Sequence, residues 1–276
     1  MNQSENRRQL PIQFPVPSVP LEDASVKMSN ALIRGAHGIN NIIEKRIVNM
    51  ALSKTPKDSS SRFSLSVQEK GWEVCLYADE YARLHKLSPN TAYEQLKSGA
   101  DSLMDRKWCI SRRHAQTKRH VTQKGPWFIL AEYCEGEGYV KLVFSPYVAS
   151  HVLSLSKYFT SYRLIQTAQL KSIYALRLFE ALESWRFPSY IWNPTLEEFF
   201  EVMDAPQSAK KDFGNTRKGI IEPAIKELTE KLDWEIHYVP QKKGRKVVGL
   251  VFNFKDNTPI AKEEEEIKAP EEILLE

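Results

Sequence analysis

The chain has 276 residues, of which 42% are hydrophobic and 27% are charged, as is typical of a globular protein with a sizeable core. It contains no run of 18 apolar residues, which excludes a transmembrane helix, and its first ten residues lack the apolar stretch of a secretory signal. Cys75, Cys109 and Cys134 lie far apart in the sequence, so we expect no disulfide framework and a cytoplasmic location.

Charge is distributed unevenly along the chain. The formal net charge is +4, but residues 257–276 hold seven Glu against two Lys, a balance of −5 that leaves +9 on the remaining residues. A basic body with an acidic tail favours a polyanionic partner. Charge alone does not distinguish DNA from RNA or from an anionic membrane surface.

The two ends of the chain predict flexible tails. Four prolines lie between positions 11 and 20, which favours an extended, polyproline-like segment over residues 1–25. Residues 257–276 predict an acidic tail of the same loose kind. The part between the tails is therefore expected to hold the folded domains.

The first half of this central part predicts the order helix, strand, helix, helix. Apolar residues recur at helical spacing over 39–53, and alternation over 62–67 predicts a strand. A second helix is expected over 78–86 and a third over 89–105, with Ser88 as its N-cap. The short turn between these two helices is typical of a helix-turn-helix. Three short strands follow, at 108–112, 126–131 and 139–144.

The second half repeats this order. A stripe of apolar residues between 170 and 185 predicts a long helix, and residues 190–192 a short strand. Thr195 and Glu198 have the spacing of a capping box at the start of the next helix. A third helix is expected over roughly 209–231. Two alternating strands at 234–239 and 247–254 follow, joined by a loop.

Pro223 conflicts with an uninterrupted third helix, because proline removes a backbone donor and clashes with the preceding turn. Either the helix bends at Pro223, or residues 213–221 form a separate turn. Both readings leave the order of elements unchanged.

This order, found twice, predicts an α+β fold with two tandem winged-helix domains, an N-terminal one over 26–148 and a C-terminal one over 149–256. Basic residues gather where such domains meet DNA. From 106 to 124 there are seven Lys or Arg and no Asp or Glu. The loop that joins the last two predicted strands is also rich in Lys and Arg. The hairpins of winged-helix domains, called wings, reach phosphates or the minor groove. Arg and Asn on the third helix of such a domain read base edges.

We therefore predict DNA contacts from the third helix and wing of each domain. In the second domain the candidates are Lys210, Lys211, Asn215, Thr216, Arg217, Lys218, Lys242, Lys243, Arg245 and Lys246. In the first domain they are Asn90, Tyr93, Lys97, Arg112, Arg113, Lys118 and Arg119.

Other constellations are weak. His114 and His120 have no Cys, Asp or Glu near them in sequence, and no nucleotide-binding or hydrolase motif is present. Tyrosines such as Tyr162 could act as nicking nucleophiles only beside a metal held by a histidine cluster. We predict no enzymatic activity, no cofactor and no metal site.

Several separated stretches, in one order, resemble the iteron-binding plasmid replication initiators (the Rep family), and among them the F-plasmid type. The stretches are Pro126-Trp127-Phe128-Ile129, Phe144-Ser145-Pro146-Tyr147, Phe159-Thr160-Ser161-Tyr162-Arg163-Leu164, the helix from Tyr174 to Glu180, Thr216-Arg217-Lys218, Ile225-Lys226-Glu227-Leu228, Lys242-Lys243-Gly244-Arg245 and Val251-Phe252-Asn253-Phe254.

The resemblance implies a role in starting plasmid replication. Monomers would bind iterons mainly through the C-terminal domain, and dimers would bind an inverted repeat, repress the initiator's own gene and so contribute to copy control. The N-terminal domain would supply the dimer interface, around Trp127, Phe128, Ile129 and Leu130. Partners would include the host replication initiator protein and the replicative helicase. This chain has Gly219 where the family relative carries a third consecutive arginine.

Three alternatives remain open at this stage. A winged-helix transcriptional regulator would share the fold and the basic wings but would bind a single operator. A DNA-nicking enzyme would cut supercoiled plasmid in a metal-dependent manner. A protein-interaction scaffold would show no salt-dependent binding to duplex DNA.

Overall fold

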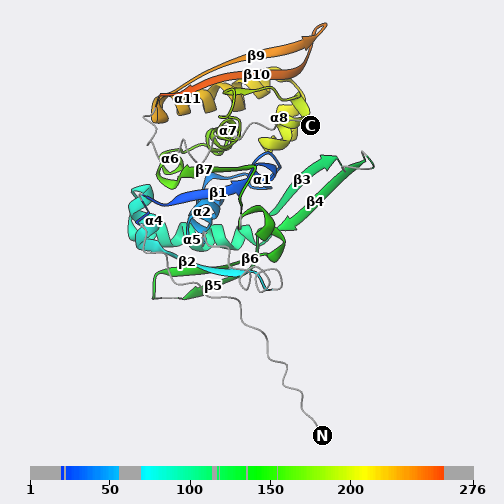
Figure 1. Cartoon of the computed structure of the whole chain (residues 1–276). Helices are drawn as coiled ribbons and strands as arrows, with labels where there is room; N and C mark the ends of the chain where they lie inside the picture. Colours follow the sequence, from blue (N-terminus) through cyan, green and yellow to red (C-terminus); the bar gives the residue numbers. More distant parts are fainter. Residues whose placement is uncertain are drawn as a thin grey trace. The chain divides into compact units, whose positions relative to one another are not determined.

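A computed structural model describes residues 20–257 of the chain except 22, 56–69, 114–116, 118, 135 and 154. The chain divides into two compact units, here called unit 1 and unit 2, and the boundary along the sequence lies between Gln169 and Leu170 (Figure 1). Most of the two predicted tails, and the strand predicted at 62–67, lie outside the described residues. No helix in the described ranges is both long and apolar enough to cross a bilayer.

Unit 1 contains the three predicted helices in the predicted order, together with strands at 72–77 and 120–126 that were not predicted. The elements of unit 1 are β1 (Ser25–Ser29), α1 (Asn30–Ile33), α2 (Ile42–Ser53), β2 (Trp72–Tyr77), α4 (Ala78–His85), α5 (Pro89–Leu103), β3 (Lys107–Arg113), β4 (His120–Pro126), β5 (Phe128–Cys134), β6 (Tyr139–Phe144), the 3-10 helix η1 (Pro146–His151), β7 (Phe159–Arg163) and α6 (Leu164–Ala168). The Ser88 side chain caps α5, as predicted, by accepting from the Thr91 amide.

The strands of unit 1 form three antiparallel groups. One sheet has the order β2-β6-β5, β3 pairs with β4, and β1 pairs with β7. The β3–β4 hairpin extends away from the helices of its unit (Figure 1). The core beneath is aromatic: Trp72, Trp108 and Trp127 are fully buried, and Trp72 stacks on Phe144 at 4.5 Å.

The pairing of β1 with β7 corrects two sequence-based expectations. Ser25 pairs with Arg163 and Ser29 with Phe159, so a strand begins at Ser25, the last residue of the predicted tail. This pairing holds the segment after the predicted boundary at 148/149 in unit 1, and the compact units divide later, after Gln169. Neither strand was predicted, because each gains its partner only across more than a hundred residues of chain.

Unit 2 repeats the winged-helix order. Its elements are α7 (Ile173–Glu183), β8 (Ile191–Trp192), α8 (Leu196–Val202), α9 (Gln207–Lys210), α10 (Phe213–Thr216), the π-helical turn η2 (Arg217–Ile221), α11 (Glu222–Leu232), β9 (Trp234–Lys243) and β10 (Lys246–Asp256). The sheet has the order β8-β10-β9, and β9 packs against α11. The predicted capping box is confirmed: the Thr195 side chain accepts from the Glu198 amide, and the Glu198 carboxylate accepts from the Thr195 amide.

The third helix of unit 2 is built in pieces. It begins at Phe213, capped by Asp212, widens into the π-helical turn and continues as α11. Pro223 explains the widening, because it cannot donate to the carbonyl four residues earlier, that of Gly219, and its ring would clash there. The amide of Glu222 bonds instead to the carbonyl of Arg217, five residues back. Pro223 is thus accommodated by an inserted residue, and the helical path from α10 to α11 stays continuous.

Gly71 is a position where the backbone demands glycine. Its φ is +73°, and an added Cβ would lie 2.0 Å from the Phe144 carbonyl oxygen. Gly136, with φ +87°, has nothing within 4 Å of an added Cβ. Both glycines therefore adopt the left-handed conformation, but only Gly71 lies close to another backbone group.

We predict that Gly71→Ala lowers the free energy of unfolding by about 1–3 kcal/mol more than Gly136→Ala does, the cost of overpacking added to that of left-handed strain. Urea denaturation followed by tryptophan fluorescence measures both variants. Equal losses would show that backbone conformation alone, without the carbonyl contact, sets the requirement at Gly71.

Candidate nucleic-acid interface

The π-helical turn of unit 2 carries the predicted base-reading side chains. Arg217, Lys218 and Gly219 are all exposed along it, and Asn215 is exposed one turn earlier. An added Cβ at Gly219 would meet nothing within 4 Å, so the surface there is open. The turn thus presents three successive exposed positions, 217–219, to the solvent.

Two predicted residues lie just before the third helix and not at its start. Lys210 is the last residue of α9 and Lys211 its C-cap, because Asp212 is extended and begins a new helix at Phe213. Both lysines are exposed, and Lys210 Nζ lies 5.9 Å from the centre of the Phe200 ring. They remain candidates for phosphate contact from the preceding turn.

Thr216 is not available to DNA, and its assignment as a contact residue is wrong. Its side chain is fully buried, and its hydroxyl donates to the Ala209 carbonyl at 2.7 Å. The reason is the late start of the helix, which turns position 216 toward the interior. Thr216 instead ties α10 to α9.

The wing of unit 2 concentrates exposed positive charge at a hairpin tip. Gly244 has φ +63° and forms the turn between β9 and β10. Lys243 pairs directly with Lys246 across the strands, an arrangement that costs folding free energy because like charges face each other. Lys242 and Arg245 are exposed beside them, and none of the four forms an ion pair within the described ranges. A bound polyanion would relieve this repulsion.

Arg217 forms an ion pair that sequence reasoning missed. Its Nε lies 3.5 Å from Glu222 Oε1, with both side chains about half exposed. Tyr238 of β9 is close to both: burial raises the pKa of its hydroxyl, Glu222 raises it further and Arg217 opposes this. Residues five apart do not lie on the same face of a regular α-helix. In the sequence, only Pro223, which widens the turn, could have indicated this ion pair.

The third helix of unit 1 offers less to DNA than its sequence predicted. Asn90 is exposed at the first turn of α5, as expected. Tyr93 is half-buried, and its hydroxyl is buried without a hydrogen-bond partner among the described residues, so its assignment as an outward-facing contact is wrong. Lys97 is also half-buried. This helix packs closely against its unit because Ala92, Leu96 and Gly99 are all buried along it.

The wing of unit 1 lies in the predicted basic segment, but β3 pairs with β4, at 120–126, a stretch that the prediction left between strands at 108–112 and 126–131. Arg112 and Arg119 are exposed on it. Arg113 lies on β3, but its side chain, like the whole of Lys118, is outside what the structure describes. At the base of the wing, burial and then Arg112 lower the pKa of His151, whose Nδ1 lies 3.0 Å from Ser29 Oγ.

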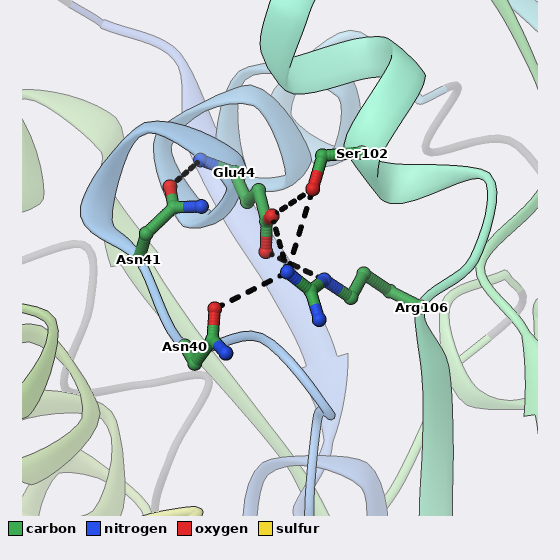
Figure 2. Close-up of polar contacts among 5 residues, drawn as sticks. All are labelled: Asn40, Asn41, Glu44, Ser102 and Arg106. Carbon is green, nitrogen blue, oxygen red and sulfur yellow. Dashed lines mark hydrogen bonds and ion pairs between the residues drawn. The ribbon is translucent and has the colours of Figure 1, made fainter.

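Arg106, at the start of the basic segment, is a structural residue. Its Nε contacts Glu44 Oε2 at 3.0 Å and its Nη2 contacts Glu44 Oε1 at 2.8 Å (Figure 2). Ser102 donates to the same carboxylate, and Asn40 Oδ1 accepts from Arg106 at 3.2 Å. Glu44 is buried, with Asn41 capping its helix. The network fixes the end of α5 and the base of the wing to the start of α2.

The predicted dimer-interface residues divide into two pairs. Trp127 is fully buried and donates to the His37 carbonyl at 2.8 Å, and Phe128 is buried against Phe144, so both are core residues and their assignment to an interface is wrong. Ile129 and Leu130 are 47% and 42% exposed on β5, an edge strand of its sheet. A register shift between Phe128 and Leu130 interrupts the alternation of inward and outward side chains along β5. The adjacent residues Ile129 and Leu130 are therefore both exposed.

Comparisons with known proteins agree with this architecture. Residues 25–183 match the family model "Initiator Replication protein, WH1" and residues 195–254 match "Initiator Rep protein, WH2". A "Probable replication protein rep" of Bifidobacterium longum is 23% identical over 246 residues, 89% of this chain and 80% of that protein. An uncharacterized 27.6 kDa protein of Escherichia coli is 24% identical over 214 residues, 75% of this chain and 85% of that protein.

Among solved structures, the Pi initiator protein in complex with iteron DNA superposes with a TM-score of 0.68 at 21% identity. The match covers 86% of this chain and 99% of that one. It therefore extends over both units and supports the fold.

The two winged helices define a DNA-binding protein of the tandem winged-helix class, as the order of elements predicted. Within that class, the chain belongs to the family of Rep replication initiators. The resemblance drawn from its sequence is confirmed.

We predict that Glu44→Gln lowers the free energy of unfolding by about 2–4 kcal/mol, because it leaves Arg106 without its buried carboxylate and the pair is only partly open to water. Glu94→Gln, an exposed position on α5, is the matched control and is expected to change it by less than about 0.5 kcal/mol. Urea denaturation of both variants measures the difference, and equal effects would contradict the structural role of the network.

Proposed function

We propose that this chain binds repeated double-stranded sites, the iterons of a plasmid origin, and initiates replication there without catalysing any covalent step. Membership of the Rep initiator family supports the role in initiation. The Pi initiator, whose fold this chain shares, was solved bound to iteron DNA. A transcriptional regulator without a replication role is the second candidate.

The observation that carries the proposal is the distribution of exposed charge in unit 2. Exposed Arg217 and Lys218 on the third helix, and the tip at 242–246, are the two places where a winged helix meets DNA. Because Asn215 and Arg217 have side chains that fit adenine and guanine edges, we assign base reading to them. Lys243 and its neighbours are assigned to phosphates. Unit 2 is then the principal iteron-binding unit.

Unit 1 is assigned a supporting contact with DNA and a role in dimerisation. Asn90, Arg112 and Arg119 are its exposed candidates, with Arg113 and Lys118 kept as sequence-based ones. A dimer would bind an inverted repeat and repress the initiator's own gene. Contacts with the host initiator protein and the replicative helicase follow from the family resemblance.

Strand opening would follow from deformation of the DNA. Bending a site costs roughly 1–6 kcal/mol, and many bound copies on adjacent repeats can add such strain. Neighbouring AT-rich duplex would then open with help from host proteins. Permanganate footprinting at the origin tests this step, and the absence of newly reactive thymines would count against it.

DNase I footprinting across the plasmid region beside the gene tests the function itself. Repeated protection with a period of about 21–22 base pairs, two helical turns, is expected for iterons. A single protected operator would favour the transcriptional regulator.

We predict that Arg217→Ala weakens binding to the footprinted site by about 1–3 kcal/mol while sparing binding to scrambled duplex, because a base contact is lost. Lys243→Ala should weaken both about equally and reduce the salt slope by about 1, because a phosphate contact is lost. Fluorescence anisotropy at several salt concentrations separates the two. Equal loss on both DNAs for Arg217→Ala would contradict base reading.

We predict that Leu130→Asp weakens homodimerisation, because β5 presents Ile129 and Leu130 on an edge strand and a carboxylate there opposes pairing. Tyr147→Asp is the control, since Tyr147 is also an exposed apolar side chain of unit 1 but lies off the β5 edge. Sedimentation velocity measures the dimer. A dimer that tolerates Leu130→Asp as well as the control would place the interface elsewhere.

A further inference from the structure

We propose that Glu222 is a positioning residue for DNA recognition: it holds Arg217 in the orientation that reads a guanine and keeps it from binding phosphates indiscriminately. The inference rests on the proposed function, because it assigns sequence selectivity within the same surface. The predicted consequence is that Glu222 sets the ratio of specific to non-specific binding. It would do so although a carboxylate by itself repels DNA.

The π-helical turn makes this pair possible. In a regular α-helix, residues five apart point about 140° away from each other around the axis. Between Arg217 and Glu222 the turn contains an inserted residue, which brings the two side chains onto one side, with Nε 3.5 Å from Oε1. The contact therefore depends on the widening that Pro223 imposes.

The contact between Glu222 and Arg217 leaves the two terminal amino groups of the arginine available to a base. Glu222 faces Nε, and the two terminal amino groups of Arg217 have no other acceptor in the described part of the chain. A guanine presents O6 and N7 to two donors at once, and the pair of terminal amino groups matches that pattern. Glu222 can therefore orient the guanidinium by one edge while the other meets the base.

Stability gives only a small reason for an acid at this place, in the first turn of α11, where a carboxylate is favoured by the helix dipole. An ion pair between side chains that are about half exposed contributes roughly 0–1 kcal/mol. Against that, Glu222 directly follows the turn whose exposed side chains, Arg217 and Lys218, are assigned to DNA, and a carboxylate near phosphates lowers affinity. Its contact with Arg217, where the π-helical turn meets α11, points to control of the arginine.

Without Glu222, Arg217 would be a mobile cation able to neutralise a phosphate on any sequence. Binding to non-cognate duplex would then gain about one released counterion, and binding to the cognate site would lose orientation of the base contact. The two DNAs would move in opposite directions. A purely electrostatic effect of one removed charge would tighten both.

The experiment compares Glu222→Gln with Glu230→Gln, which removes the same charge from the same helix at an exposed position paired with Lys226. Full-length proteins are titrated by fluorescence anisotropy with the footprinted duplex and with a scrambled one, from 50 to 200 mM salt. Each guanine of the site is also replaced in turn by 7-deazaguanine, which lacks the N7 acceptor. Thermal melting of each variant confirms that folding is unchanged.

For Glu222→Gln we expect the specific-to-non-specific ratio to fall at least about fivefold, the lower end of one lost bidentate contact. The salt slope on scrambled duplex should steepen by about 0.9. The guanine whose 7-deaza form weakens the wild type should no longer matter in Glu222→Gln or in Arg217→Ala. Glu222→Asp, which keeps the carboxylate, should restore part of the ratio.

The inference is overturned if Glu222→Gln behaves like Glu230→Gln on both duplexes, or if its guanine dependence equals that of the wild type. Either result leaves the proposed function standing, provided that the wild type prefers its site and Arg217→Ala loses that preference. A wild type without preference for any repeated site would instead refute the proposed function.

Discussion

The missing amide hydrogen of Pro223 is the constraint on which the recognition surface depends. Because the carbonyl of Gly219 has no partner four residues on, the helix widens and the Glu222 amide bonds to Arg217. The widened turn brings Glu222 beside Arg217, next to the exposed positions 217–219. In a regular helix, residues five apart would point about 140° away from each other and the pair would be separated. One backbone feature thus decides which side chain lies beside Arg217.

The fold separates charges that hold it together from charges left on its surface. Arg177 is fully buried in unit 2, where it contacts Glu180 at 2.8 Å and donates to the Val202 carbonyl, fixing α7 to the end of α8. Arg106 does the same for unit 1 through Glu44. A buried charge that lost its partner would cost several kcal/mol, so these arginines are committed to the fold. Among the described residues, Arg112 and Arg119 on one wing and the four basic residues at 242–246 on the other are exposed and can contact a polyanion.

Much of the architecture could be predicted because its signals are local. The capping box at Thr195 and the N-cap at Ser88 fix helix starts within four residues, and both were found from sequence alone. The pairing of β1 with β7 could not be found, because it depends on a partner far along the chain. Side-chain direction was mispredicted for a different reason, because it depends on the residue at which a helix begins and on the register of a strand. Asp212 restarts the helix and turns Thr216 inward, and a register shift in β5 exposes Ile129 beside Leu130.

The two units therefore differ in what their surfaces can do, although their folds share one order of elements. The third helix of unit 1 buries the middle of its length, and two exposed apolar side chains of that unit, Ile129 and Leu130, lie at a sheet edge, which suits association between chains. Unit 2 exposes polar and charged side chains along its third helix and at its wing tip, which suits a duplex groove. Positive charge alone would bind all DNA alike, since phosphates are the same at every sequence. Selectivity needs an arginine whose orientation is fixed before it meets the base, and the carboxylate of Glu222 is in contact with Arg217 to fix it.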